Sequence, residues 1–380
     1  MCNLFCLGTY NAWLSVYEKK SMLLSTPLPF VEAFISELDN GLRQYNSDLG
    51  LSRKQRYWLV FCLMGIILTN SICWARFERI SLGQYKVGAL SWMFRQAKIS
   101  WEMLLQIGVA LVLKQHGITE GVLATDDSDH GRSKTTKRIF KAHKLKDKKR
   151  GGYINGQTIV LLVLVTPKVT LPVGFEFYQA DPAQRSWQKE DKRLQKQGVA
   201  KKKRPPAPAP NPAYPSKPQL ALRLIAQFRR HHPQIKVKAV VADALYGQAK
   251  FMDAAAALFG GVQVISQLRH NQNIRYRTRT YHVSSYFSKF QGVAQSIRIR
   301  GQDPIQATVG SARLKVCAHG KKRFVIALKY PGEKEYRYLV ATDLTWRTID
   351  IVQAYSLRWL VEICQPQYPH SLLHLYAEVV

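Results

Sequence analysis

The stretch QTIVLLVLV, residues 157–165, contains only aliphatic side chains after its first two residues. A strand without apolar/polar alternation is one whose two faces are both buried, as in the centre of a sheet covered by helices. Similar strands are expected at 121–125 (GVLAT) and 235–243 (IKVKAVVAD), and amphipathic helices at 219–232 and 251–260. Strands that alternate with helices predict an α/β fold built on a mixed sheet.

The regions around this core have different textures. Residues 30–118 predict an N-terminal all-helical domain, with Ser52 as a helix N-cap and a helix that stops at Gly117. Residues 189–218 are charged and then Pro-rich, which indicates a loop or flexible arm. We expect these parts in order: a helical domain that is a candidate for DNA binding (1–118), the first part of the core (119–271), an all-β insertion (272–345), a last core helix (346–365) and an aberrant tail (366–380).

One uncharged segment, residues 57–75, is nearly long enough to cross a bilayer. Thr69, Asn70 and Ser71 interrupt it, and we expect a buried helix of the N-terminal domain instead of a membrane span. The first 20 residues have no basic segment typical of a signal peptide. The six cysteines are scattered without a C-x-x-C pair, which favours a reduced cytosolic protein.

The charge balance indicates a polyanionic partner. The chain has 56 Lys and Arg against 25 Asp and Glu, a net charge of +31, and its 46% hydrophobic content excludes a disordered chain. Nucleic acid is the expected partner. Residues 132–150 hold ten Lys or Arg and only one acid, and we expect this stretch to form a positive strip beside the first Asp that contacts the DNA backbone without reading sequence. The residues of this strip that we expect to bind DNA are Lys146, Lys148, Lys149 and Arg150.

A cluster of acidic residues in so basic a chain indicates a specific role for these residues. DDSD, residues 126–129, follows one predicted strand, Asp243 ends another, and Glu362 lies on the predicted helix TIDIVQAYSLRWLVE. Taken alone, DDSD is more typical of a solvated turn. Taken together, the carboxylates of Asp126, Asp243 and Glu362 are expected to converge, and three such groups need compensating positive charge. Two Mg²⁺ or Mn²⁺ ions supply it and favour phosphodiester chemistry.

Three motifs make the chain resemble the DDE transposases of bacterial insertion sequences, in the branch with a β-rich insertion. LATDDS is similar to the first-Asp region, VVADALYG to the second-Asp region, and YSLRWLVE to the Y-x-x-R-x-x-x-E part of the Y-R-E-K signature. The resemblance implies a ribonuclease H-like fold, with Asp126, Asp243 and Glu362 as ligands of two ions. Asp127 is an alternative first ligand, because the Asp doublet is ambiguous by one residue.

The same resemblance implies the partners. Tyr355 and Arg358 would hold phosphates of the transposon end, and the protein would act on double-stranded DNA, both transposon ends and target, as a homodimer. It implies a bacterial cytoplasmic protein associated with the nucleoid, with no membrane and no small-molecule substrate.

The tail departs from the family pattern. The signature Lys should lie seven residues after Glu362, but that position is Pro369, and Pro366 should end the helix. We expect a truncated or frameshifted copy with impaired transposition. Two alternatives stay open: a catalytically dead DNA-binding remnant, and a ribonuclease H-like nuclease that cuts without strand transfer.

Overall fold

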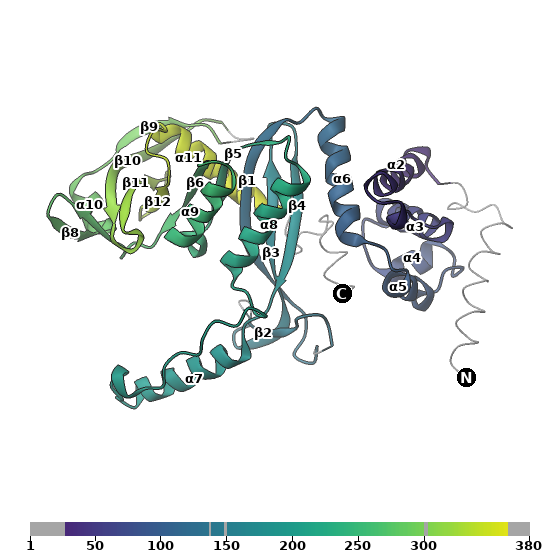
Figure 1. Ribbon diagram of the computed structural model, residues 1–380, viewed down its shortest axis with the longest axis horizontal. Helices are drawn as coiled ribbons and strands as arrows, with labels where there is room; N and C mark the ends of the chain where they lie inside the picture. Colours follow the sequence, from purple (N-terminus) through teal and green to yellow (C-terminus); the bar gives the residue numbers. More distant parts are fainter. Residues whose placement is uncertain (1–26, 137, 148–149, 300–302, 364–380) are drawn as a thin grey trace. The chain divides into compact units, whose positions relative to one another are not determined.

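The structure is a computed structural model that describes residues 27–136, 138–147, 150–299 and 303–363 (Figure 1). The chain forms two compact units. Among the described residues, one unit comprises residues 27–117, and the other comprises Ile118–Ile363 apart from the gaps just given. The tail residues Pro366 and Pro369 lie outside the described residues, as do Lys148 and Lys149.

The first unit is helical throughout its described part, as predicted. Its α-helices are α2 (Pro29–Tyr45), α3 (Arg53–Thr69), α4 (Trp74–Ile80), α5 (Val87–Gln96) and α6 (Trp101–Gln115). Ser52 is the N-cap of α3, and it forms a reciprocal capping box with Gln55. The buried ring of Trp58 lies against Phe94 and Trp101, with ring centroids 5.9 and 6.1 Å apart. Aromatic side chains around Trp58 therefore form the centre of the core of this unit.

The uncharged segment at 57–75 is divided between α3 and α4. Asn70 ends α3 in the left-handed conformation (φ 46°), and the two helices meet at 89°. No single helix in the described part of the chain is long and apolar enough to span a membrane. Two bent helix pairs, α3 with α4 and α5 with α6, reach that length and composition only when counted together.

The second unit is built on one sheet. Its core strands are β1 (Glu120–Gly131), β3 (Tyr153–Val165), β4 (Thr170–Tyr178), β5 (Lys236–Ala242) and β6 (Gln263–Leu268). β3 is antiparallel to both β1 and β4, whereas β1, β5 and β6 run parallel in that order. The last ten residues of β3 are buried, which confirms the central strand predicted from its sequence. The mixed sheet is consistent with a ribonuclease H-like fold.

Helices cover this sheet. α8 (Lys217–His231) contacts β3 and β4, α9 (Ala249–Leu258) contacts β6, and the C-terminal segment contacts β1, β5 and β6. That segment is not one helix: α11 (Thr348–Ser356) continues into a 3₁₀ turn, η5 (Leu357–Trp359), and then α12 (Leu360–Ile363). In Figure 1, α8 lies in front of the sheet and α11 behind it.

Residues 272–345 form a β-rich block that extends the core sheet. β12 (Arg337–Ala341) pairs antiparallel with β6, and the sheet continues through β11 (Lys321–Lys329), β10 (Ile305–Val316), β7 (Asn273–Tyr276) and β8 (Arg279–His282), with β9 (Val293–Ile297) also on β10. The block is not purely β, because it includes α10 (Val283–Lys289). The buried residues of α10, Val283, Tyr286 and Phe287, fit a helical spacing that the short VSSYF stretch did not reveal.

The predicted loop at 189–218 is wrong in its first part. α7 (Pro182–Lys196) occupies residues 189–196, and Asp181 caps it by accepting a hydrogen bond from the Ala183 amide at 2.8 Å. A proline at the first helical position supports the same start. The basic run at 132–150 also contains a strand, β2 (His143–Lys146), which pairs with β3.

Candidate active site

Asp126 and Asp243 are neighbours at the point where the pairing of two parallel strands stops. Asp243 directly follows β5, as predicted, whereas Asp126 lies inside β1, which continues to Gly131 because it stays paired with β3. The paired register of β1 and β5 ends at Thr125 and Ala242, and each Asp is the next residue in the chain. Asp243 also caps the short turn η3 (Ala244–Tyr246), because its Oδ1 accepts a hydrogen bond from the Leu245 amide at 2.8 Å. The sheet thus brings two carboxylates from distant parts of the sequence to one point.

The carboxyl groups of Asp126 and Asp243 lie in a poorly solvated environment. Burial raises the pKa of Asp126 to about 6, against the opposing effect of Arg358, and the neighbouring Asp243 raises it further. Burial also raises the pKa of Asp243, although the Leu245 amide opposes this. A buried and a half-buried carboxylate that are neighbours favour a bound cation, because water compensates their charges poorly.

Arg358 supplies one positive charge to this pair. Its Nη1 lies 2.6 Å from Asp126 Oδ2, and its Nη2 lies 3.3 Å from Glu362 Oε1. The Arg358 and Asp126 side chains are only 17% and 12% exposed, whereas the Glu362 side chain is 46% exposed. The guanidinium therefore joins the first and third predicted acids, and it lies where a shared metal ion would be expected.

The expected convergence of Asp126, Asp243 and Glu362 into one metal-binding group is not seen. Within residues 27–363, apart from the gaps given above, no three His, Cys, Asp or Glu side chains are grouped closely enough to hold a metal ion. The Arg358 guanidinium instead lies between Asp126 and Glu362 and forms an ion pair with each. The metal-ligand role of the three acids stays a prediction.

The acids of the DDSD stretch are divided between two faces of β1. Successive side chains of a strand point to opposite faces, so Asp126 faces Arg358 while Asp127 faces α8. Asp127 Oδ2 lies 2.5 Å from Lys217 Nζ, and Lys217 is the first residue of α8. Asp129, on the face of Asp127, accepts a 2.6 Å hydrogen bond from Thr158 of β3. Asp126 is therefore the member of the cluster that shares a face with Glu362.

Two buried tyrosine hydroxyls border the carboxylates. Tyr246 and Tyr355 are 0% and 5% exposed. The Tyr246 hydroxyl lies beside the Asp127 carboxylate, and the Tyr355 hydroxyl lies beside the Gln267 side chain. Burial raises the pKa of Tyr246, and the charges of Asp127, Asp126 and Asp243 raise it further. Burial likewise raises the pKa of Tyr355, partly opposed by Arg358. Sequence reasoning gave no role to Tyr246, although the D-x-x-Y-G motif was its signal; the phosphate-binding role of Tyr355 stays a prediction.

Gly247 closes the turn that carries Asp243. A Cβ at this position would lie 2.3 Å from the backbone oxygen of Gln267, so no side chain fits without a backbone shift. His319 Nε2 donates a 3.0 Å hydrogen bond to the Gly247 carbonyl, and the buried Arg323 donates to His319 Nδ1 at 3.2 Å. Since His319 and Arg323 belong to the β-rich block, that block directly supports the Asp243 turn.

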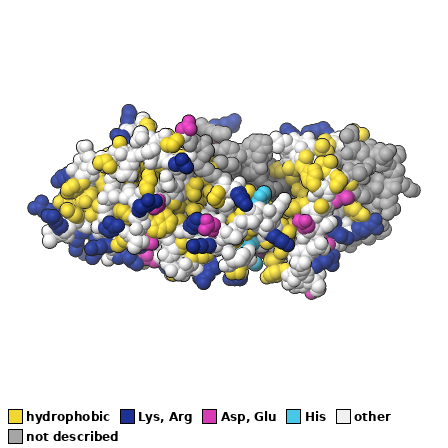
Figure 2. Space-filling view, turned by 90° about the horizontal axis from the view of Figure 1, so that it is seen from above, with side chains coloured by type: hydrophobic (Ala, Val, Ile, Leu, Met, Phe, Trp, Pro, Cys, Tyr) yellow, Lys and Arg dark blue, Asp and Glu magenta, His cyan; other side chains and the backbone are white. Residues whose placement is uncertain are grey.

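The basic residues predicted to contact DNA are only partly described. Lys146 is the last residue of β2, and the Arg150 amide donates a 3.0 Å hydrogen bond to Asp147 Oδ1. Their DNA-binding role is untested. Figure 2 shows exposed Lys and Arg side chains at many places, with acidic side chains among them.

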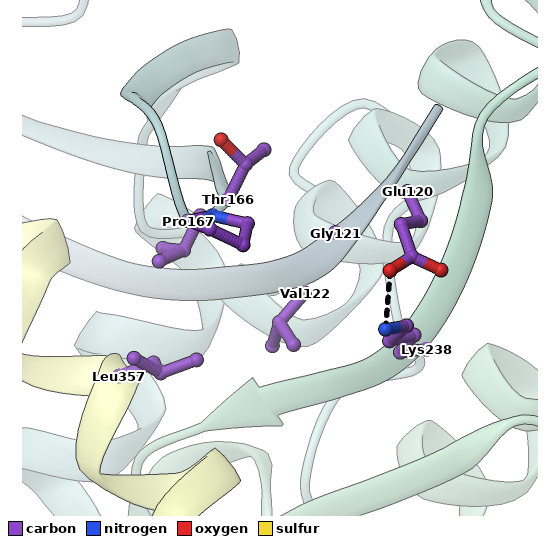
Figure 3. A pocket seen from close by; sticks show the side chains of 8 residues that line it. Glu120, Gly121, Val122, Thr166, Pro167, Lys238 and Leu357 are labelled. Carbon is purple, nitrogen blue, oxygen red and sulfur yellow. Dashed lines mark hydrogen bonds and ion pairs between the residues drawn. The ribbon is translucent and has the colours of Figure 1, made fainter. Parts of the chain in front are cut away.

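A pocket lies at the N-terminal end of β1, beside Glu120. Glu120, Val122, Thr166, Lys238 and Leu357 are among the residues that line it, and Glu120 forms an ion pair with Lys238 (Figure 3). Glu120 precedes Asp126 by six residues, or about 20 Å of strand. The pocket is therefore not a binding site formed around the carboxylates.

Comparison with known proteins supports a nuclease. A profile of the family described as DDE superfamily endonuclease matches residues 47–306, which include Asp126 and Asp243 but end before Glu362. No protein with a curated description matches the chain in sequence. Among solved structures, the NurA nuclease from Sulfolobus solfataricus is similar over 68% of this chain and 78% of its own, with 10% identity and a TM-score of 0.26, which is too low to support any argument.

Cleavage of phosphodiester bonds in nucleic acid, typically with divalent metal ions, is the activity that such a family implies. The profile covers well over half of the chain, and it includes β1, which carries Asp126, and β5, which leads into Asp243. The chain belongs to the DDE superfamily endonucleases.

Proposed function

We propose that this protein is a DNA transposase that cuts double-stranded DNA at the ends of an insertion sequence and joins them to a target. The observation that carries the proposal is that Asp126 on β1 and Asp243 after β5 are neighbours, with Arg358 and Glu362 on the C-terminal segment η5–α12 beside Asp126. The order and types of these residues are those of the Y-x-x-R-x-x-x-E helix and the two Asp motifs.

The side chains at this site are of the types that bind divalent ions, but the described residues do not bring three of them together as a ligand set. Asp126 and Asp243 offer hard oxygen ligands, and the raised pKa values of both carboxyls favour a compensating cation. Glu362 would complete the ligand set. Bound Mg²⁺ or Mn²⁺, two ions in our proposal, would activate a water or 3′-hydroxyl and stabilise the leaving oxygen.

The protein's own side chains have distinct roles in this proposal. Asp243 is fixed by its cap on η3, whereas Glu362 is half-exposed and can turn toward the Asp pair once Arg358 releases it. The Arg358 guanidinium is suited to bidentate contact with a phosphate. We propose that the DNA backbone draws Arg358 from Asp126, so that substrate binding and assembly of the acids are coupled. We also propose a homodimer that acts on DNA in the bacterial cytoplasm.

The test is metal-dependent cleavage of plasmid DNA. Asp126→Ala, Asp243→Ala and Glu362→Gln should each abolish nicking in Mg²⁺ or Mn²⁺ while DNA binding in EDTA is unchanged. Glu335→Gln, at an exposed acid on the turn before β12, is the matched control and should nick at the parental rate. Nicking by Asp243→Ala at the parental rate would show that the site is wrongly assigned.

A second candidate is a nuclease that cuts without joining strands. The family profile favours it in one respect, because the matched residues end at 306, before the helix that carries Arg358 and Glu362. Incubation with labelled insertion-sequence ends and a plasmid target separates the two. Covalently joined products support the transposase, and cleavage without joining supports the nuclease.

A further inference from the structure

The helix α7 is an arm with an unusual surface. None of its 15 residues is buried, and in Figure 1 it extends away from the sheet beyond β2. Residues 182–204, which contain α7 and the turn after it, hold nine Lys or Arg and two acids. An ordered helix that buries nothing in its own unit leaves one face available for a partner.

The arm is ordered by the segment that follows it. Trp187 Nε1 donates a 2.8 Å hydrogen bond to the Pro205 carbonyl, and Gln184 Nε2 donates a 2.6 Å hydrogen bond to the Pro208 carbonyl. Arg204 forms an ion pair of 2.9 Å with Asp191. Gln184, Trp187 and Asp191 follow the helical i, i+3, i+7 spacing. One face of α7 is therefore covered by the Pro-rich return segment.

The opposite face carries a basic stripe. Its members are Arg185, Lys189, Lys192, Arg193 and Lys196, which at 3.6 residues per turn lie within about 100° of the helix circumference. Lys189, Lys192, Arg193 and Lys196 are exposed. Arg193 is paired with Glu190, whereas the three lysines have no partner among the described residues.

The stripe continues onto the strand β2. Arg185 Nη2 donates a 3.1 Å hydrogen bond to the carbonyl of Lys144, so the base of α7 lies against β2. β2 itself carries Lys144 and Lys146, both exposed. Positive charge thus runs from β2 along the arm, over about 16 Å of helix from Arg185 to Lys196.

We propose that the α7 stripe, together with β2, binds the phosphate backbone of duplex DNA outside the catalytic site, without reading its sequence. The occupant follows from charge complementarity: duplex DNA carries about one charge per 1.7 Å of its axis, and the stripe presents a row of lysine charges along one straight edge. Lysines without fixed partners suit backbone contact better than base readout. The proposal rests on the proposed function only in taking DNA as the substrate.

The test measures binding in EDTA, where no cleavage occurs, with two duplexes of unrelated sequence over a series of salt concentrations. The variant is Lys189→Gln/Lys192→Gln/Lys196→Gln. The control, Lys250→Gln/Lys322→Gln/Lys334→Gln, removes the same charge from exposed sites on α9, β11 and the turn before β12. Circular dichroism establishes that both variants are folded.

We expect the stripe variant to bind both duplexes about tenfold or more weaker at 0.1 M salt, with a log–log salt slope reduced by about 2 to 3. The control should lose much less affinity and keep its slope. Equal losses in both variants, or an unchanged slope in the stripe variant, would overturn the proposal; in the second case an acidic protein becomes the alternative occupant. Because nicking is assayed separately, failure here leaves the proposed function untouched.

Discussion

Arg358 Nη1 lies 2.6 Å from Asp126 Oδ2, in an ion pair whose side chains are 17% and 12% exposed. The two residues are 232 positions apart in the sequence, and the pair ties the last helical segment to the first strand of the sheet. Removing one partner of a buried pair leaves the other charge uncompensated. The pair therefore serves both as a stabilising contact and as the present source of positive charge at the candidate active site.

Arg358→Gln should lower the free energy of unfolding by about 3 kcal/mol, since Asp126 would keep its burial and lose its cation. Mg²⁺ or Mn²⁺ should then raise the melting temperature of the variant more than that of the parent, because the ion takes the vacated place. Calorimetry across a metal titration measures both effects. Arg347→Gln, which breaks an exposed pair with Asp350, is the control and should cost less than about 1 kcal/mol. An equal metal effect on parent and variant would contradict this view of Arg358.

The Asp doublet can be resolved by substitution. Asp126→Asn should abolish metal-dependent cleavage, because Asp126 shares a face with Arg358 and Glu362. Asp127→Asn should retain cleavage and lower stability by about 1 to 3 kcal/mol, because it breaks the part-buried bond with Lys217. Nicking rates and urea unfolding curves distinguish the two, and loss of cleavage in Asp127→Asn with retained stability would make Asp127 the ligand.

Gly247→Ala should displace the turn that carries Asp243. The new Cβ would lie 2.3 Å from the Gln267 backbone oxygen, so strain of about 1 to 3 kcal/mol is expected, together with slower cleavage. Gly88→Ala in α5 is the control, since its Cβ meets nothing within 4 Å and alanine favours a helix. Thermal unfolding and nicking rates report both effects. A Gly247→Ala protein with parental stability would show that the turn adapts.

Acid should destabilise the fold through His232. Burial lowers the pKa of His232 to about 4, so the folded state holds it neutral while the unfolded chain binds a proton below about 6.5. The His232 contribution to the free energy of unfolding should therefore fall as the pH drops from about 6.5 to about 4, whereas the raised pKa of Asp126 acts in the opposite direction. His232→Gln should flatten that part of the pH profile, whereas the exposed His270→Gln should not. Parallel profiles for parent and His232→Gln, from urea unfolding, would exclude this residue as the cause.

Local pattern was enough to predict the core and part of the candidate site. The apolar run at 157–165 predicted a strand buried on both faces because burial of a strand leaves no polar alternation. The adjacency of Asp126 and Asp243 followed from two predicted strands of the same texture that each lead into an acid, although β1 continues past Asp126 to Gly131. Both predictions depend only on residues that are close together in the chain, because the periodicity of a strand or helix can be recognised within such a segment.

Other features depended on contacts between distant segments. The sequence predicts a loop from residue 189, where the structure has the second half of α7, because this helix buries no residue and so shows no apolar periodicity. Its order comes from contacts with the return segment at 204–208. The helix α10 has only seven residues, too few for its sequence to show a helical periodicity.

The candidate site shows the same division. The sequence determined which residue types stand at the strand ends and on the last helix, because these follow from short motifs. Only the tertiary structure decided that Arg358 lies between Asp126 and Glu362, and that Asp127 turns to Lys217. A buried carboxylate pairs with whichever cation the fold brings within about 3 Å of it. The sequence pattern does not contain that distance.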